Sequence, residues 1–397
     1  MDYIKQGTPS FRRALLALFA GGFNTFAILY DIQPLMPELS RDFHSSPTLT
    51  SLSLSLTTIS MAISMLFVGS LSDAWGRKSI MTVSLFAASV LAVLTAISPD
   101  FHVLLVLRVI AGIVLAGLPA IAMTYLSEEI EPNGLGIAMG IYISGNSIGG
   151  MGGRIISGMV TDYFNWRIGI AVIGVLSLAA TLLFSLTLPP SKHFRQRSLN
   201  LRTMAESLLS QFKDSNLVCI YALGFLLMGS FVTLYNYIGY QLAAPPYSLS
   251  QSLVGWIFIV YITGTFSSTW MGRLADRHPR HKVIWIALGI VFTGAVITLS
   301  GNLWAKIAGI AIFTFGFFGG HSVASSWIGK LAKQHKAQAS SLYLFCYYVG
   351  SSIGGTTGGI FWTRFGWAGV IALIIFFVFT AFLVSLRLVS VSEAGHA

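Results

Sequence analysis

The chain has 397 residues, of which 54% are hydrophobic and only 10% are charged. A soluble domain carries about 25% charged residues, so this composition excludes an ordinary globular protein and places the chain in a lipid bilayer. The formal net charge of +10 would suit a nucleic-acid-binding protein, but the positions of the 24 Lys and Arg residues argue against that class. With a cytoplasmic N-terminus, 18 of them fall on the cytoplasmic side, 4 near the opposite face and 2 inside helices. This is the positive-inside pattern, which predicts that both termini are cytoplasmic and that nucleic acid is not a partner.

Apolar segments long enough to cross a membrane recur along the whole chain. A spanning helix needs about 20 mostly apolar residues. The sequence therefore predicts an all-α membrane protein with twelve transmembrane helices, near 14–36, 50–71, 79–97, 103–126, 135–159, 168–188, 217–241, 253–271, 283–300, 303–328, 339–360 and 367–387.

A basic, polar stretch divides these segments into two groups of six. Pro189 and Pro190 end the sixth segment, and the longest connection of the chain follows them. We predict an N-terminal six-helix bundle over residues 1–189, a cytoplasmic linker over 190–216 and a C-terminal six-helix bundle over 217–397. The spacing of apolar residues in the linker predicts either a short amphipathic helix on the membrane surface or a disordered connection; these residues are Leu201, Met204, Leu208, Leu209 and Phe212.

The two halves repeat each other. The charged turn that starts at Gly69 returns 203 positions later at Gly272. Tyr30-Asp31 matches Tyr235-Asn236 at an offset of 205, and the glycine-rich run from Tyr142 matches the run from Tyr347 at the same offset. Several matches near one offset indicate two parallel six-helix repeats, which is an architecture of secondary transporters.

Asp31, Arg108 and Arg154 are charged residues inside predicted spans. A charge near a helix centre costs about 2.5–3.5 kcal/mol on insertion scales and therefore faces a partner or a water-filled cavity. At 1.5 Å per residue, Asp31 and Arg108 each lie roughly 9 Å below the outer boundary, with Arg154 at a similar or shallower depth. We predict a proton-sensitive cluster in which Asp31 titrates, because arginine keeps its charge. The alternatives are a permanent Asp31–Arg108 salt bridge and an Arg154 that reaches the outer surface or pairs with Asp162.

Polar and aromatic residues on several spans are candidates for binding a substrate. Asn24 shares a helix face with Asp31 at i and i+7, and Thr233, Asn236 and Tyr240 share a face of the seventh span. His321 lies deeper, where it would bind substrate, titrate, or make a hydrogen bond in a helix contact. Gln33 belongs to the same candidate set, and aromatic walls are expected from Tyr343 and Tyr347.

The charged turn is similar to the signature turn of the major facilitator superfamily, Gly-x-Leu-x-Asp-x-x-Gly-Arg-Lys. The resemblance implies a latch at the cytoplasmic gate, whereas a simpler interpretation is that the charges only orient the loop. The second copy matches in part, because Arg277-His-Pro-Arg280 lacks the inner glycine. The gate residues implied are Gly69, Asp73, Gly76, Arg77 and Lys78, with Gly272, Asp276 and Arg277 in the second copy.

Further motifs extend the resemblance over essentially the whole chain. Arg108 and Gly112 are similar to the Arg-x-x-x-Gly core of a second superfamily motif. The fifth span resembles the antiporter motif at Gly145, Asn146, Gly149 and Gly150, although its Gly-Pro pair is changed to Gly145-Asn146, which weakens an inference of export. Together with Leu29-Tyr30, Gln33-Pro34, the run 125–129 and the stretch 320–329, these motifs resemble the YnfM-type inner-membrane transport proteins of the twelve-span, drug:proton antiporter-like group. In antiporter relatives an acid in helix 1 and the helix 4 arginine serve proton coupling, which implies roles for Asp31 and Arg108.

These features predict a secondary active transporter that exports a small molecule in exchange for protons. Uptake or facilitated exchange of a sugar or organic ion is the alternative, and a membrane-embedded receptor or enzyme is a reading from another class. The sequence shows no metal-ligand cluster, phosphate-binding loop or nucleophile motif, so we expect no enzyme activity, no metal and no cofactor, with the proton gradient as the energy source. We expect a monomer in a bacterial inner membrane, with the lipid bilayer and a small molecule as partners.

Overall fold

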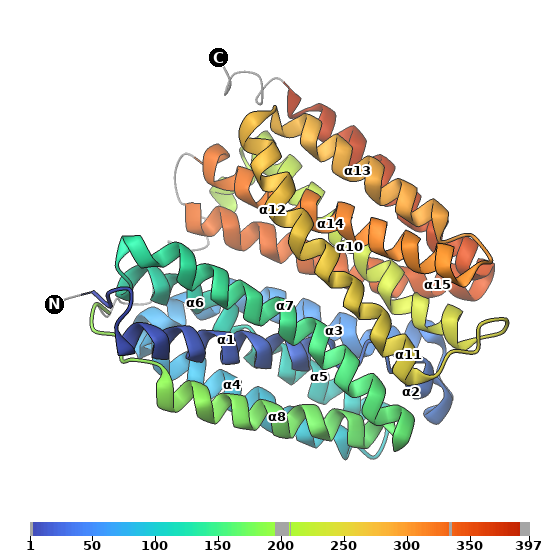
Figure 1. Cartoon of the computed structure of the whole chain (residues 1–397), viewed down its shortest axis with the longest axis horizontal. Coiled ribbons are helices and arrows are strands. Elements are labelled where there is room, and N and C mark those ends of the chain that lie inside the picture. The colour runs from blue at the N-terminus through green and yellow to red at the C-terminus, as the bar shows by residue number, and fades with distance from the viewer. Residues whose placement is uncertain (1–2, 195–205, 207, 333–335, 390–397) are drawn as a thin grey trace. The chain divides into compact units, whose positions relative to one another are not determined.

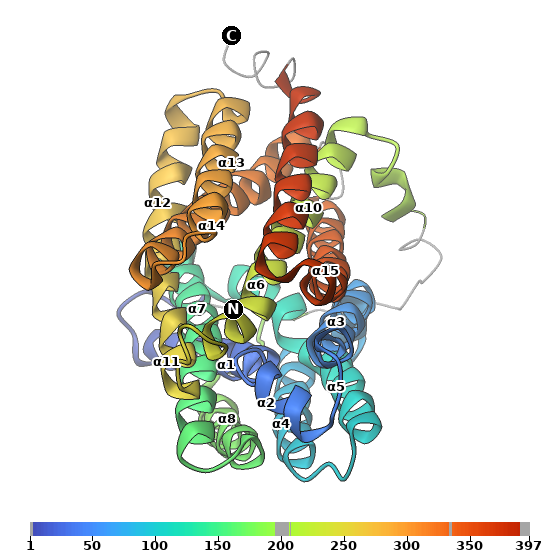
Figure 2. The same ribbon diagram turned by 90° about the vertical axis from the view of Figure 1, so that its right-hand side faces the viewer.

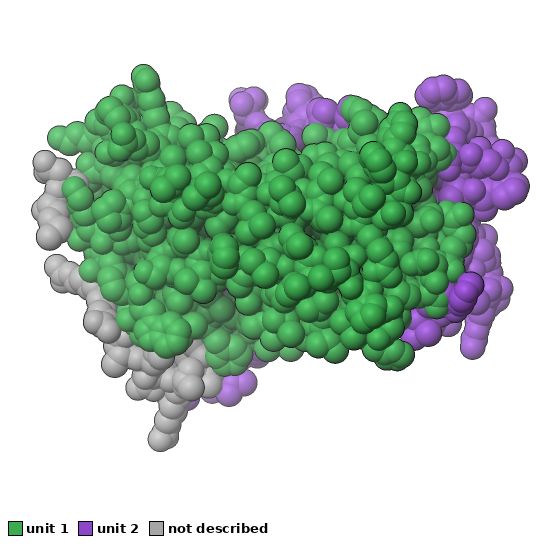
Figure 3. Space-filling model, turned by 90° about the horizontal axis from the view of Figure 1, so that it is seen from below, with its two compact units in different colours: residues 1–43, 56–200, 250–256 green, residues 44–55, 201–249, 257–397 purple. Residues whose placement is uncertain are grey.

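The computed structural model describes residues 3–194, 206, 208–332 and 336–389. Within them the regular structure is helical, apart from one isolated bridge between Ile4 and Ile130. The chain divides into two compact units, coloured separately in Figure 3. Unit 1 contains Met1–Phe43, Leu56–Asn200 and Ser250–Trp256, and unit 2 contains His44–Ser55, Leu201–Leu249 and Ile257–Ala397. Two helical stretches therefore begin in one unit and continue in the other.

Unit 1 is a bundle in which the first helix is central. Helix α1 packs along α7 and α8, and α4 packs along α8 (Figure 1). The helices that contribute to this unit are α1 (Pro9–Tyr30), α2 (Met36–Asp42), the later part of α3 (Pro47–Trp75), α4 (Arg77–Ala96), α5 (Phe101–Leu115), α6 (Gly117–Glu129), α7 (Pro132–Tyr163), α8 (Trp166–Thr187) and α11 (Gln251–Trp256).

Unit 2 is built in the same way around α10. Helix α10 packs along α15, and α14 packs against both α12 and α13, which lie on one side of the unit in Figure 2. The elements of this unit are the first residues of α3, α10 (Ser215–Ala243), the 3₁₀ turn η1 (Ile257–Val260), α12 (Tyr261–Arg277), α13 (Arg280–Ile297), α14 (Leu303–Leu331) and α15 (Lys336–Leu386).

The helices account for the twelve predicted spans. Among the described residues, ten stretches are long and apolar enough to cross a membrane. One of the ten runs from Gln338 to Leu386, and Gly366, with φ 62° and ψ −149°, interrupts it and separates two spans. The glycine-rich α7, 32 residues long, lies outside the ten and supplies the twelfth. The predicted all-α fold with twelve transmembrane helices is confirmed.

Polar side chains begin several of these helices. The side chains of Asp100, Asn165 and Asn302 accept hydrogen bonds from the backbone N–H groups of Val103, Ile168 and Ala305 at 3.0, 3.0 and 3.1 Å. Such caps satisfy N–H groups that have no partner inside the helix. Asp100 and Asn302 begin α5 and α14, so the two units start corresponding helices in the same way.

The first span differs from the prediction of one continuous helix over 14–36. Helix α1 ends at Tyr30, residues 31–35 form turns, and α2 begins at Met36. The physical reason is Pro34, which has no backbone N–H to donate and disfavours helical geometry at Gln33 before it. The break exposes the last carbonyl groups of α1 inside the unit and places Asp31 at the C-cap.

Glycines at every fourth position let the neighbouring helices approach closely in both units. A Cβ atom at Gly145 would lie 2.5 Å from the Phe19 carbonyl oxygen, and one at Gly153 would lie 2.7 Å from Ala27 Cα. In unit 2, a Cβ atom at Gly354 would lie 2.7 Å from Gly229 Cα. The ladder 145, 149, 153 on α7 returns as 350, 354, 358 on α15, the same offset of 205. The motif glycines therefore fix the packing of α1 on α7 and of α10 on α15.

Only part of the predicted linker helix lies within the residues that the structure describes. Leu201 and Met204 lie outside the described residues, while residues 208–211 are helical and Leu209 and Phe212 are exposed. The amphipathic helix and the boundaries of the linker remain predictions.

Candidate functional site

The break after α1 brings Asp31 and Arg108 together in unit 1. The Arg108 guanidinium donates from Nη1 to the Ile28 carbonyl at 3.0 Å and from Nη2 to the Leu29 carbonyl at 2.9 Å. The same Nη1 lies 3.4 Å from Asp31 Oδ1. Both residues are almost fully buried, with exposures of 0% for Asp31 and 2% for Arg108. Arg108 therefore neutralises the carbonyl end of α1 and pairs with the carboxylate beside it.

Arg154 adds a second guanidinium from α7. Its Nε donates to Gln33 Oε1 at 2.7 Å, its Nη1 donates to the Gly150 carbonyl at 2.6 Å, and its plane lies 4.0 Å from the centre of the Tyr30 ring. Arg154 is 1% exposed. Gln33 thus positions a buried cation in this structure, and Arg154 is enclosed within the unit and does not extend to its surface.

Ser157 connects α7, the helix that carries Arg154, to Asp31. Its hydroxyl donates to the Asp31 carbonyl oxygen at 2.7 Å. Asp31 Oδ2 is buried and has no hydrogen-bond partner among the described residues. We call Asp31, Arg108 and Arg154 the charged layer of unit 1. The charged layer joins the broken end of α1 to α5 and α7.

Asn24 lies apart from this layer. Its amide nitrogen is 2.7 Å from the Ser177 carbonyl oxygen, 2.7 Å from Thr181 Oγ1 and 3.1 Å from Ser89 Oγ. These contacts face α4 and α8, and seven residues along a helix separate Asn24 from Asp31 by about 10 Å. The structure places Asn24 in a polar contact between helices.

The seventh-span candidates lie in unit 2. The Thr233 hydroxyl is 2.7 Å from the Gly229 carbonyl oxygen and 2.9 Å from that of Gly354, so Thr233 joins α10 to α15. Asn236 is 1% exposed and lies close to Gly355. Tyr240 is half-buried and near Trp362, with 6.0 Å between the ring centres.

The structure gathers His321, Tyr343 and Tyr347 into one cluster. His321 Nδ1 lies 2.9 Å from the Tyr343 hydroxyl oxygen, and the imidazole is 4.6 Å from the Tyr347 ring centre. The Phe317 ring stacks nearly parallel to the imidazole, with 6.1 Å between the ring centres. This cluster supplies flat apolar surfaces and one hydrogen-bonded imidazole.

Arg77 is the centre of the charged turn. Its Nη1 lies 2.5 Å from Asp73 Oδ1, and its Nε and Nη2 lie 3.1 and 2.9 Å from the two carboxylate oxygens of Glu128. Gly76 has φ 97°, a backbone conformation that favours glycine, and α4 begins directly after it. Lys78 donates to the Leu188 carbonyl oxygen at 2.5 Å. The turn therefore ties the end of α3 to α6 and to the end of α8.

The second copy of the turn is organised by Arg280. Arg280 Nη2 lies 3.9 Å from Asp276 Oδ1, the same i,i+4 relation that joins Arg77 to Asp73. Its Nη1 donates to Ser326 Oγ at 3.2 Å. Arg277, the residue suggested by the motif, is exposed, and so is Asp276. Gly69 and Gly272 have no close neighbour that a Cβ atom would strike.

Three residues that make these contacts were not predicted from the sequence: Glu128 beside Arg77, Gly153 against α1 and Arg280 beside Asp276. Glu128 and Glu129 appeared only within the run 125–129, although two adjacent carboxylates at the end of a span indicate a cationic partner nearby. Glu129 is 1% exposed and accepts hydrogen bonds from His193, at 2.8 Å from its backbone nitrogen and 3.1 Å from Nδ1.

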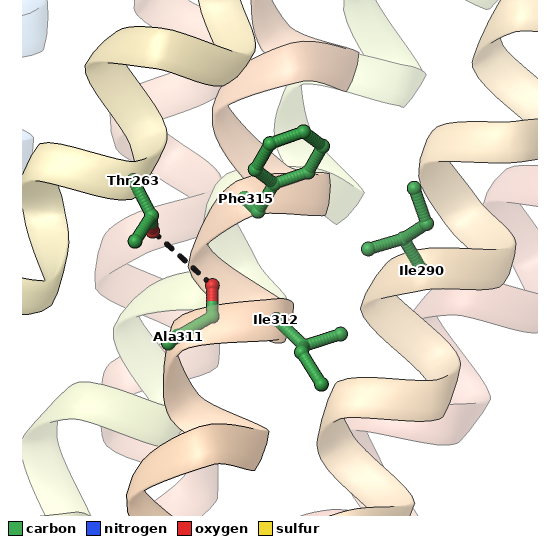
Figure 4. A pocket seen from close by; sticks show the side chains of 5 residues that line it. All are labelled: Thr263, Ile290, Ala311, Ile312 and Phe315. Carbon is green, nitrogen blue, oxygen red and sulfur yellow. Dashed lines mark hydrogen bonds between the residues drawn. The ribbon is translucent and has the colours of Figure 1, made fainter.

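An apolar pocket of about 260 Å³ lies elsewhere in unit 2 (Figure 4). It is lined by Thr263, Ile290, Ala311, Ile312 and Phe315. The Thr263 hydroxyl donates to the Ala311 carbonyl oxygen at 3.3 Å, so the one side-chain hydroxyl of the lining is engaged between helices. This pocket offers a polar substrate no charged group.

Within the described part of the chain, three or more His, Cys, Asp or Glu residues do not meet in a group able to hold a metal ion. The charged layer of unit 1 instead combines an acid with two permanent cations, an arrangement suited to binding protons and charged solutes rather than to covalent chemistry.

Comparison with known proteins agrees with this arrangement. The family model of the Major Facilitator Superfamily matches residues 14–247 and again residues 217–397. The chain therefore belongs to the major facilitator superfamily, and it is a multi-pass membrane transporter and not an enzyme.

Two relatives match over nearly their full length. The chain is 56% identical to the uncharacterized MFS-type transporter YybF of Bacillus subtilis over 381 residues, 96% of this chain and 94% of that protein. It is 50% identical to the inner membrane transport protein YnfM of Escherichia coli over 387 residues, 98% of this chain and 93% of that protein. The predicted resemblance to YnfM-type proteins is confirmed.

A solved structure shows the same fold at low sequence identity. The chain resembles a bacterial homolog of the human lysosomal transporter Spinster with a TM-score of 0.79 and 15% identity, over 97% of this chain and 99% of that one.

Proposed function

We propose that the protein is a proton-coupled secondary transporter of a small molecule in which Asp31 carries the proton, with export in exchange for proton entry as the first candidate direction. One observation carries the proposal: a fully buried carboxylate lies 3.4 Å from a buried arginine at a break in a spanning helix. Intramembrane acids in such surroundings are costly and mark proton or ion pathways.

The contacts of Asp31 suggest how a proton would act. Ionised Asp31 attracts Arg108, and protonation removes that attraction while Arg108 keeps its bonds to the Ile28 and Leu29 carbonyls. The Asp31 carbonyl oxygen accepts the Ser157 hydroxyl, so a shift of the loop after α1 is transmitted to α7. A proton that moves down 100 mV supplies about 2.3 kcal/mol for such a cycle.

The direction of coupling depends on the sign of linkage between substrate and proton. Export by exchange follows where substrate binding needs ionised Asp31 and therefore excludes the proton. Uptake of an organic ion together with protons is the second candidate, and the presence of two guanidiniums beside one carboxylate favours it. The remaining candidate residues, Thr233, Asn236, Tyr240, His321, Tyr343 and Tyr347, are proposed to bind the substrate.

The relatives and the charge distribution support a location. YnfM is described as an inner membrane transport protein, and we propose the same bacterial membrane for this chain, with both termini in the cytoplasm and the protein working as a monomer. The Arg77 and Arg280 turns would then lie on the cytoplasmic side, where opening and closing of the gate would break and remake their contacts.

The proposal is tested with purified protein in proteoliposomes that contain a pH-sensitive dye. A panel of anionic, neutral and cationic compounds is added, and compound-dependent proton movement is recorded. Asp31→Asn is expected to abolish this movement. Asp100→Asn is the control, because it removes one carboxylate but keeps the helix cap. Counterflow of a compound without any proton movement in the unaltered protein would contradict proton coupling.

A further inference from the structure

The charged layer of unit 1 contains more positive than negative charge. Arg108 and Arg154 both act electrostatically on the carboxylate of Asp31, and all three side chains are 0–2% exposed. The other buried carboxylate among the described residues, Glu129, ends α6 and pairs with His193. Two guanidiniums therefore share one acid in this layer.

Neutral groups orient the two arginines but leave the formal charge unchanged. The carbonyl oxygens of Ile28, Leu29 and Gly150 and the side chain of Gln33 accept their hydrogen bonds. The layer carries one net positive charge while Asp31 is ionised and two when it is protonated. Buried net charge is unfavourable in a low-dielectric environment and favours the entry of an opposite charge.

We infer that the substrate is a small organic anion, a carboxylate, sulfonate or phosphate ester, whose charged group is attracted to the guanidiniums of Arg108 and Arg154. The planar fork of arginine donors matches the oxygens of such groups in geometry and in charge. This inference rests on the proposed transport through the charged layer. It adds the chemical class of the substrate.

The repeat places neutral residues in unit 2 where unit 1 has Asp31 and Arg154. The corresponding residue of Asp31 is Asn236, and the position of Arg154 is taken by Gly359 at the same offset of 205. The candidate substrate residues of this unit are hydroxyl, amide, imidazole and aromatic groups. The unit 2 positions that correspond to Asp31 and Arg154 therefore carry no formal charge.

An anionic substrate determines the sign of proton coupling. Ionised Asp31 repels the anion and competes with it for Arg108, whereas a proton on Asp31 removes both effects. Proton and anion therefore strengthen each other's binding and move in the same direction. This selects the second candidate function, cotransport of an organic ion with protons, over export by exchange.

The experiment compares compounds that differ in charge but little in shape. Thermal unfolding of the detergent-purified full chain is measured with benzoate and benzamide, succinate and succinamide, and p-toluenesulfonate and p-toluenesulfonamide, with benzyltrimethylammonium as the cation. Since a ligand of the native state raises its stability, at least one anion is expected to raise the unfolding temperature more than its neutral partner does.

Variants locate the effect. Arg154→Gln should weaken binding of the stabilising anion about tenfold or more, the loss expected for a charge-assisted hydrogen bond. Arg167→Gln is the matched control: Arg167 also donates to backbone carbonyls, at 2.6 Å for Ser98, and lies 4.3 Å from the centre of the Trp166 ring, but it belongs to the start of α8. It should bind the anion like the unaltered protein. Arg154→Lys, which keeps the charge, should bind with intermediate affinity.

Anions that stabilise no more than their neutral partners, or a stronger effect of the cation, would overturn the inference. Equal losses for Arg154→Gln and Arg167→Gln would also overturn it. The outcome is separate from proton coupling: anion binding with no compound-dependent proton movement would contradict the proposed function and leave the class of ligand established.

Discussion

The two units share a packing scheme but differ in the chemistry of their central helices. In both, glycines spaced by four residues bring one helix of the second half of the bundle against the first helix. In unit 1 the first helix is broken beside Asp31, Arg108 and Arg154, whereas α10 of unit 2 continues through Asn236 to Ala243. Duplication has thus kept the backbone contacts, while the buried charge of this layer belongs to one unit.

The two charged turns differ in the same direction. Arg77 contacts two carboxylates, at 2.5 and 2.9 Å, while Arg280 lies 3.9 Å from one exposed carboxylate and bonds to a serine hydroxyl. Unit 1 therefore carries the stronger ionic contacts both within its spans and at the charged turn. We expect substitutions at the charged layer of unit 1 to alter proton coupling and binding of the anionic group, and those at the candidate residues of unit 2 to alter binding of the rest of the substrate.

The largest effect is expected from moving the acid between units. The double variant Asp31→Asn/Asn236→Asp keeps the total charge but moves the carboxylate from unit 1, which contains Arg108, to α10 of unit 2. We predict that the double variant accumulates substrate under a pH gradient at least tenfold less than the unaltered protein does. It should accumulate no more substrate than Asp31→Asn alone. Proteoliposome uptake measures this, and recovery of uphill transport would show that the two units are interchangeable as proton carriers.

Substitutions in the glycine ladders of the two units should lower stability by similar amounts, because both units use the same helix packing. Gly149→Val and Gly354→Val each drive a side chain into the backbone of the facing helix, at Phe23 and Gly229. Overpacking of this kind costs about 1–3 kcal/mol. Gly136→Val on the same α7 meets nothing within 4 Å and is the control. Unfolding temperature and elution profile report the loss; a ladder variant as stable as Gly136→Val would remove the packing role.

Replacing the central arginine should destabilise the protein more in the first charged turn than in the second. Arg77→Gln leaves Asp73 and Glu128 without their cation, and because both carboxylates are about a third exposed we expect a loss of roughly 1–2 kcal/mol. Arg280→Gln should cost less than about 1 kcal/mol, as expected for a long, exposed ion pair. Chemical unfolding monitored by tryptophan fluorescence compares them. Equal losses would mean that the carboxylate of Glu128 adds nothing.

The smallest effect is expected at the aromatic cluster of unit 2. Tyr343→Phe removes the hydroxyl that lies 2.9 Å from His321 Nδ1. Losing one hydrogen bond of this kind lowers the free energy of unfolding by about 0.5–1.5 kcal/mol. Substrate affinity should change while the pH dependence of transport stays the same, because the coupling group is assigned to unit 1. A shifted pH profile in Tyr343→Phe would make His321 part of the coupling machinery.

The sequence predicted the repeated features well. Hydropathy finds most of the spans, since a membrane helix must satisfy its own backbone, and repeated offsets revealed the duplication. Charges inside spans pointed to Asp31 and Arg108 because such residues need partners, and the structure places them together.

What could not be predicted depends on side-chain direction and on local breaks. Asn24 and Asp31 lie on one helix face by periodicity, but Asn24 bonds to α4 and α8 and Asp31 belongs to a turn after the helix. The motif match predicted Arg277 as a gate residue. In the structure it is Arg280, four residues after Asp276, that faces the Asp276 carboxylate. Gln33 was predicted only as a substrate ligand, and nothing in the sequence indicated that its side chain accepts a hydrogen bond from Arg154.

The most direct test of the account is the number of protons exchanged on binding. Protein in weakly buffered detergent solution is mixed with the anion that stabilises it most, and the pH change is recorded for the unaltered chain, Asp31→Asn and Asp100→Asn. The account predicts proton uptake by the unaltered chain and by Asp100→Asn, and none by Asp31→Asn. Equal uptake by Asp31→Asn, or proton release on binding by the unaltered chain, would contradict it.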